Sequence, residues 1–138
     1  MKLRTLRGRV AAITVKRLIV DDGRLNHGMK VKEFHVWAPS VAGSTDVECA
    51  LGLDYDMAGD QDASDNRQIG WAAQTTSATS RVMQFSILDP DHIVINDLYI
   101  NNFSDDEANY LVILEPVVLS DDEAILSLIK ERSQDDLR

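Results

Sequence analysis

The fold class is decided by the stretch DVECALGLDY, residues 46–55. Every second residue from Val47 to Tyr55 is apolar, and the residues between them are small or acidic. In a β-strand, successive side chains point to opposite faces, so this alternation predicts a strand with one face on a core and the other in water. Cys49 and Tyr55 are then expected on the core face, where a free cysteine packs as a small apolar side chain.

The same period of two continues until about residue 119. Turn signals such as DDG at 21–23 and DPD at 89–91 separate the segments. The apolar run at 93–95 is typical of a strand covered on both faces. Seven or eight short strands predict an all-β protein, an antiparallel β-sandwich that is jelly-roll-like. Besides 46–55, the expected strands are 9–20, 30–38, 67–74, 81–88, 92–100 and 109–119.

Only the end of the chain changes to helical spacing. Ser120 and Glu123 fit a capping box, and apolar residues then recur on one helical face. We therefore expect one short C-terminal helix packed on the same domain. The predicted organisation is a basic N-terminal arm (1–9), a β-sandwich (10–119), the helix (120–133) and a polar tail (134–138).

Composition limits the class of protein. A chain of 138 residues is expected to form one domain. Its single cysteine excludes an internal disulfide, and no apolar run is long enough to span a membrane. The first ten residues lack the apolar stretch of a signal peptide. The sequence therefore predicts a soluble intracellular protein without membrane contact.

The charges are unevenly distributed along the chain. Residues 1–32 carry nine lysines and arginines against two aspartates, whereas residues 33–138 carry five basic and 21 acidic side chains. Three explanations stay open: the basic segment contacts nucleic acid, it contacts the acidic body of another copy, or the charges simply face water on one domain. The acidic body argues against nucleic acid as the main ligand, because it would repel phosphates.

Motifs for catalysis are missing from the sequence. GxSxG, GxxxxGK and GxGxxG do not occur, and Cys49 has no basic neighbour to lower its pKa. No HxH or HxxxH spacing joins His27, His35 and His92. We therefore predict no enzyme, no catalytic residues, no cofactor and no metal site. A cupin-type barrel that gathers His35 and His92 at a metal is the remaining enzymatic reading.

A carbohydrate- or calcium-binding β-sandwich module is the alternative. The acidic loop 54–65 contains oxygen ligands of the kind calcium takes, although its spacing does not match the helix–loop–helix calcium motif. Alternation places Trp37 on the face of Glu33 and His35, so it is the best candidate for an exposed aromatic that stacks on a sugar. The loop carboxylates are those of Asp54, Asp56, Asp60, Asp62 and Asp65.

The layout of basic arm, acidic β-domain and small capped helix resembles that of small virion proteins with a single jelly roll. The stretches DNRQIGW (65–71) and KERSQDD (130–136) also look like short reading frames of environmental phages. This resemblance implies a capsid or capsid-associated protein, located in the virion and assembled in the host cytoplasm. The arm has four basic residues, fewer than family members whose arm binds the genome, so shell building is favoured over nucleic-acid contact.

These observations together predict a non-enzymatic virion structural protein that self-assembles into a homo-oligomer, with other virion proteins as further possible partners. Arginines of the basic segment are expected to reach acidic loops of a neighbouring copy, and sandwich edges supply apolar contact area. The predicted assembly residues are Arg4, Arg7 and Arg9 on one side and Asp56, Asp60 and Asp62 on the other.

Overall fold

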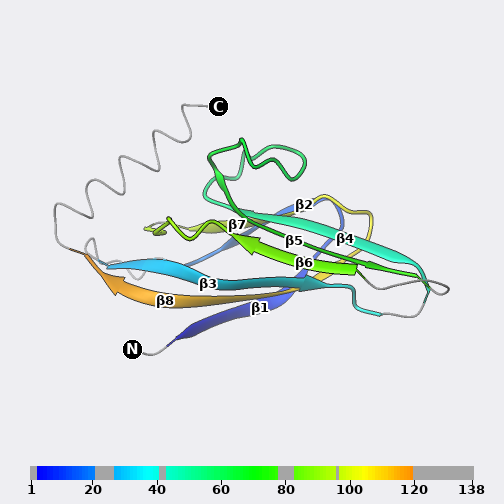
Figure 1. The fold of residues 1–138 in the computed structure, drawn as a ribbon, viewed down its shortest axis with the longest axis horizontal. Coiled ribbons are helices and arrows are strands. Elements are labelled where there is room, and N and C mark those ends of the chain that lie inside the picture. Colours follow the sequence, from blue (N-terminus) through cyan, green and yellow to red (C-terminus); the bar gives the residue numbers. More distant parts are fainter. Residues whose placement is uncertain (1–2, 21–26, 41–42, 78–82, 96, 120–138) are drawn as a thin grey trace.

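A computed structural model describes residues 3–20, 27–40, 43–77, 83–95 and 97–119. These residues form eight strands in antiparallel sheets (Figure 1). The expected helix over 120–133 and tail over 134–138 lie outside the described residues. The strands are β1 (Arg4–Val10), β2 (Thr14–Leu18), β3 (His27–Trp37), β4 (Thr45–Gly52), β5 (Gln68–Thr76), β6 (Met83–Leu88), β7 (Leu98–Asn102) and β8 (Ala108–Val118).

The strands make two sheets, of order β1-β8-β3 and β2-β7-β4-β5-β6, which pack face to face (Figure 1). Pairing is nested along the chain: β1 pairs with β8, β2 with β7, and β4 with β5. The remaining pair, β3 and β6, meets through side chains, because Gln84 Nε2 donates to the Val36 carbonyl at 3.3 Å and the Ser86 hydroxyl donates to the Phe34 carbonyl. The nesting of β1 with β8, β2 with β7 and β4 with β5 is that of a jelly roll, but β6 pairs with β5 and not with β3. The predicted antiparallel β-sandwich is confirmed.

The core lies between the two sheets and follows the period of two. On β4 the side chains of Val47, Cys49 and Leu51 are buried, as the sequence predicts. Phe34 and Leu114 of the facing sheet are fully buried opposite them. Burying a side chain of this size contributes roughly 1.5–3 kcal/mol, so this alternation holds the two sheets together.

The N-terminal segment is a strand of the sandwich rather than a separate arm. Residues 4–10 pair with β8 over their whole length, from Arg4 opposite Leu114 to Val10 opposite Ala108. Alternation explains the difference, because Val10 faces the core while Arg7 and Arg9 occupy positions that face solvent. The basic composition of the segment is therefore compatible with a strand.

The expected strand over 9–20 is divided by a turn at residues 12–13. Ile13 has a φ of 50°, and its N–H donates to the Ser104 carbonyl at 3.1 Å. The division follows from the topology, because β1 and β2 belong to different sheets. The fully buried Asn102 supports this corner by donating from Nδ2 to the carbonyls of Ala11 (3.2 Å) and Asp106 (2.8 Å).

Two further expectations differ from the structure. Tyr55 is 65% exposed rather than part of the core, because β4 ends at Gly52, where the register with β5 shifts. Its ring instead meets Tyr99 edge to face, with centroids 6.3 Å apart. The expected strand over 92–100 is shorter, because β7 begins at Leu98; of the described residues before it, Val94 forms an isolated bridge with Met29.

Candidate interaction surfaces

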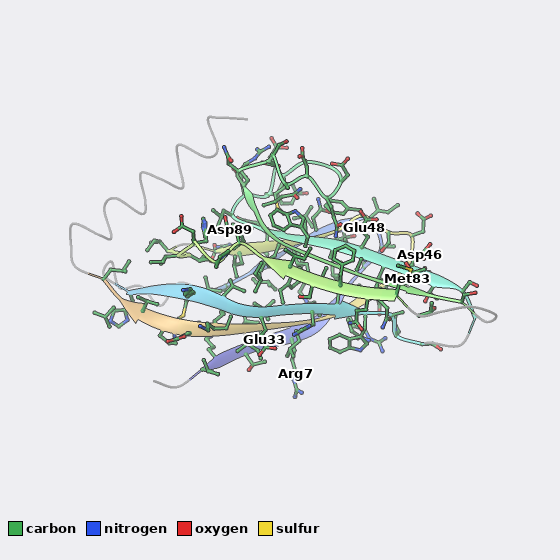
Figure 2. All side chains as sticks on the ribbon, in the orientation of Figure 1. Arg7, Glu33, Asp46, Glu48, Met83 and Asp89 are labelled. Carbon is green, nitrogen blue, oxygen red and sulfur yellow. The ribbon has the colours of Figure 1, made fainter. Side chains whose placement is uncertain are left out.

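The outer face of the three-stranded sheet carries Arg7 and Arg9 of β1, together with the carboxylates of Glu33 on β3 and Glu115 on β8. Arg9, Asn109 and Trp37 lie in register across β1, β8 and β3, and Arg7, Leu111 and His35 form the next row. We call these six residues the basic face. Figure 2 shows Arg7 pointing from β1 away from the sandwich. Trp37 is 37% exposed, which confirms the expectation of an exposed aromatic at this position.

A shallow hollow of about 540 Å³ lies on the basic face between its arginines and Trp37. Its lining includes Gly8, where an added Cβ would come within 3.0 Å of the Tyr110 hydroxyl oxygen. Gly8 lies on the same side of the sheet as the buried Val10 and Tyr110, so an added side chain would press on the Tyr110 ring rather than enter the hollow.

The three arginines predicted for assembly have different surroundings. Arg4 points toward the end of β2 and donates to the carbonyls of Ile19 (3.1 Å) and Val20 (3.3 Å). Arg9 makes an exposed ion pair with Glu107, with Nη1 3.1 Å from Oε1. Among the described residues, Arg7 has no hydrogen-bonding or ionic partner. Arg7 is thus the arginine whose charge is available to another molecule.

The predicted acidic partners lie in the loop 53–67, on the opposite side of the sandwich from β1 (Figure 1). Asp56 and Asp60 are exposed, whereas Asp62 is half-buried and accepts hydrogen bonds from the backbone N–H (2.9 Å) and hydroxyl (2.5 Å) of Ser64. The structure therefore does not bring these aspartates and the arginines of β1 together within one chain. It leaves them on opposite faces.

A buried carboxylate fixes the shape of this loop. Asp65 accepts from the N–H of Ala58 at 2.8 Å, and from the N–H (3.0 Å) and Nε (3.2 Å) of Arg67. Burial alone would raise the pKa of Asp65, but these hydrogen bonds and the Arg67 charge outweigh it and lower the pKa below its ordinary 3.8. Gln61 ties the loop to the sheet by donating to the carbonyls of Cys49 and Ala72.

A second acidic pair, which the sequence did not single out, lies on the outer face of the five-stranded sheet. Asp46 and Glu48 project from β4 on the exposed side, near Met83 of β6 (Figure 2). Neither carboxylate forms an ion pair within the described part of the chain. The alternation in 46–55 already assigns both residues to the solvent face, but it does not distinguish them from the more numerous aspartates of the loop.

The side chains that could serve as a nucleophile or as metal ligands lie in unsuitable surroundings. Burial and the neighbouring Glu48 carboxylate raise the pKa of the Cys49 thiol to about 12, so it is not a nucleophile at neutral pH. His35 lies on the basic face beside Glu33, whereas His92 is buried. Within the described ranges, no three His, Cys, Asp or Glu side chains gather in a way that could hold a metal ion.

The structure is thus an antiparallel β-sandwich that carries Arg7 on one outer face and the carboxylates of Asp46 and Glu48 on the other. Comparisons with protein-family models, curated proteins and solved structures gave no match for this chain. Among the residues whose structure is described, no helix is long and apolar enough to cross a membrane.

Proposed function

We propose that the protein is a non-enzymatic structural subunit of a viral or phage particle, and that its copies associate head to tail. In this proposal the basic face of one copy contacts the acidic side of the next. Arg7 is the principal cation and Arg9 a secondary one, while Arg4 serves its own chain through the carbonyls that it binds. The loop aspartates Asp56, Asp60 and Asp62 belong to the acidic side.

The observation that carries this proposal is that, in the described part of the chain, a cation without an ion pair (Arg7) and two carboxylates without ion pairs (Asp46 and Glu48) lie on opposite outer faces of one sandwich. A surface that complements the far side of the same molecule makes a heterologous contact, which repeats from copy to copy and closes into a ring or shell when the rotation allows. The jelly roll is also a fold of viral capsid domains, which supports the virion as the location.

Carbohydrate binding is the second candidate, and it is supported by the hollow beside Trp37. An exposed indole next to the Asn109 amide is a combination that can stack on a sugar ring and bind its hydroxyls. Titration of the protein with a panel of glycans, followed by tryptophan fluorescence in wild type and Trp37→Phe, tests it. A saturable change in wild type that is lost in the variant would favour this function over assembly.

Sedimentation velocity at low and high salt tests the assembly proposal. We expect wild type to form oligomers at about 0.05 M salt and to dissociate as the screening length falls at 1 M. Arg7→Glu should abolish association. The matched control is Arg17→Glu, which changes the charge equally but lies on the five-stranded sheet, where Arg17 pairs with Asp97. A wild-type monomer under all conditions, or equal behaviour of the two variants, would overturn the proposal.

A further inference from the structure

The outer face of the five-stranded sheet presents apolar and acidic side chains side by side. In register across β6, β5 and β4, Phe85 lies opposite Ala73, which lies opposite Glu48. The next row leads from Met83 through Thr75 to Asp46. Two strand spacings, roughly 10 Å, therefore separate the apolar column of β6 from the carboxylates of β4.

The apolar column is unusually exposed for large side chains. Met83 is 69% exposed, Phe85 44% and Ile87 55%. Beside them, a groove of about 390 Å³ is lined mainly by apolar atoms of Phe85, Ile87, Ala63 and Trp71. The Trp71 ring is held in place because its Nε1 donates to Gln68 Oε1 at 2.8 Å. A contiguous apolar patch of this kind marks an interaction site on a soluble domain.

The basic face has the same spacing with the opposite charge. Trp37 is separated from Arg9 by Asn109, which again amounts to two strand spacings, or roughly 10 Å. Arg7 and Arg9 are two residues apart on one strand, as are Asp46 and Glu48. The basic face thus has an aromatic side chain beside two cations, and the five-stranded sheet has an apolar column beside two anions. The spacing is the same on both surfaces and the charges are opposite.

We propose that the acidic-apolar face of β4, β5 and β6 is the docking surface for the basic face of a second copy. Trp37 of one copy packs on Phe85 and Met83 of the next, while Arg7 pairs with Asp46 and Glu48. This inference rests on the proposed head-to-tail association and names the surface that accepts the basic face. It assigns that role to strand residues rather than to the loop aspartates.

Charge complementarity indicates that the partner which docks on this face is a second copy of the chain. The patch lies beside two carboxylates without an ion pair in the described residues, so its partner must supply cations next to apolar area. The basic face offers both, with Arg7 unpaired in the same part of the chain and Trp37 exposed. Sheets that pack face to face lie about 10 Å apart, a distance at which arginine and carboxylate side chains from opposite sheets meet.

Complementary charge reversal tests the ionic part of this contact. Arg7→Glu and the double variant D46K/E48K should each remain monomeric at low salt. An equimolar mixture should recover the oligomers of wild type, because every junction in an alternating assembly then joins opposite charges. Recovery also demonstrates that both variants are folded. A mixture that stays monomeric while wild type associates would overturn the inference.

The apolar part is tested by truncation with a matched control. Trp37→Ala and Phe85→Ala should each raise the apparent dissociation constant of the oligomer at least tenfold. Tyr55→Ala removes an aromatic ring that is 65% exposed and belongs to neither surface, so it should leave the constant within a factor of two. Equal constants for all three variants would overturn the inference.

The loop variant D56K/D60K separates this inference from the proposed function. If D56K/D60K abolishes association and D46K/E48K does not, copies still associate head to tail but the loop accepts the basic face, and the inference is wrong. If D46K/E48K abolishes association and D56K/D60K leaves it intact, the inference is supported. A wild-type chain that is monomeric throughout would overturn both proposals.

Discussion

Replacing Asp65 with alanine should lower the free energy of unfolding by about 3–5 kcal/mol, the usual cost of removing one partner of a buried ion pair. The side chain of Asp65 has no solvent exposure and that of Arg67 is 7% exposed. The substitution leaves the guanidinium charge buried without its partner. It also removes the acceptor for two backbone N–H groups, those of Ala58 and Arg67.

Urea denaturation at pH 7, followed by circular dichroism, measures this change. With a slope of about 1–3 kcal/mol per molar urea, the midpoint should fall by roughly 2 M. Asp60→Ala is the control, because the side chain of this exposed loop aspartate forms no hydrogen bond or ion pair with the described residues, and the change should alter the free energy by less than about 0.5 kcal/mol. If Asp65→Ala were destabilised no more than Asp60→Ala, the reasoning about loop 53–67 would be refuted.

Three further predictions follow from the same structure. Because folding lowers the pKa of Asp65, its contribution to stability is complete above the ordinary carboxyl pKa of 3.8 and is lost as the pH falls through the lower pKa of the folded state. In an acid titration, the free energy of unfolding of Asp65→Asn should therefore fall less over that pH range than the free energy of unfolding of wild type. With a thiol pKa near 12, Cys49 should react with a thiol reagent at pH 8 only after unfolding, and equal rates in folded and urea-unfolded protein would contradict this. Asn102→Ala should cost about 2–4 kcal/mol by calorimetry, because it leaves the carbonyls of Ala11 and Asp106 without their donor, and a loss below about 1 kcal/mol would contradict the role of this corner.

The strands could be predicted where one face of a strand is buried. The alternation in 46–55 correctly identified β4, and it assigned Cys49 to the core. It failed at Tyr55, because a register shift at Gly52 ends the strand and no local pattern announces a shift in pairing. It also could not show that residues 4–10 pair with β8, since that contact joins segments about 100 residues apart.

The candidate surfaces could be predicted only in part. Arg7 was identified from the charge of its segment, and Trp37 from alternation, because both features are local in sequence. Arg4 instead binds carbonyls at the end of β2, and this contact depends on how one sheet packs on the other. The pairing of the apolar column of β6 with Asp46 and Glu48 depends on the strand order, which composition and periodicity do not contain.

The central claim is that copies meet through opposite faces, and isotope-mixed cross-linking tests it most directly. Equal amounts of ¹⁴N- and ¹⁵N-labelled protein are associated at low salt, coupled with a carbodiimide that joins lysines to carboxylates, and digested for mass spectrometry. In the Arg7→Lys variant, which keeps the positive charge and supplies an amine at this position, we expect mixed-isotope links from residue 7 to the carboxylates of Asp46 and Glu48. Links that join only peptides of the same isotope, or mixed-isotope links that join the three-stranded sheet to itself, would contradict the account.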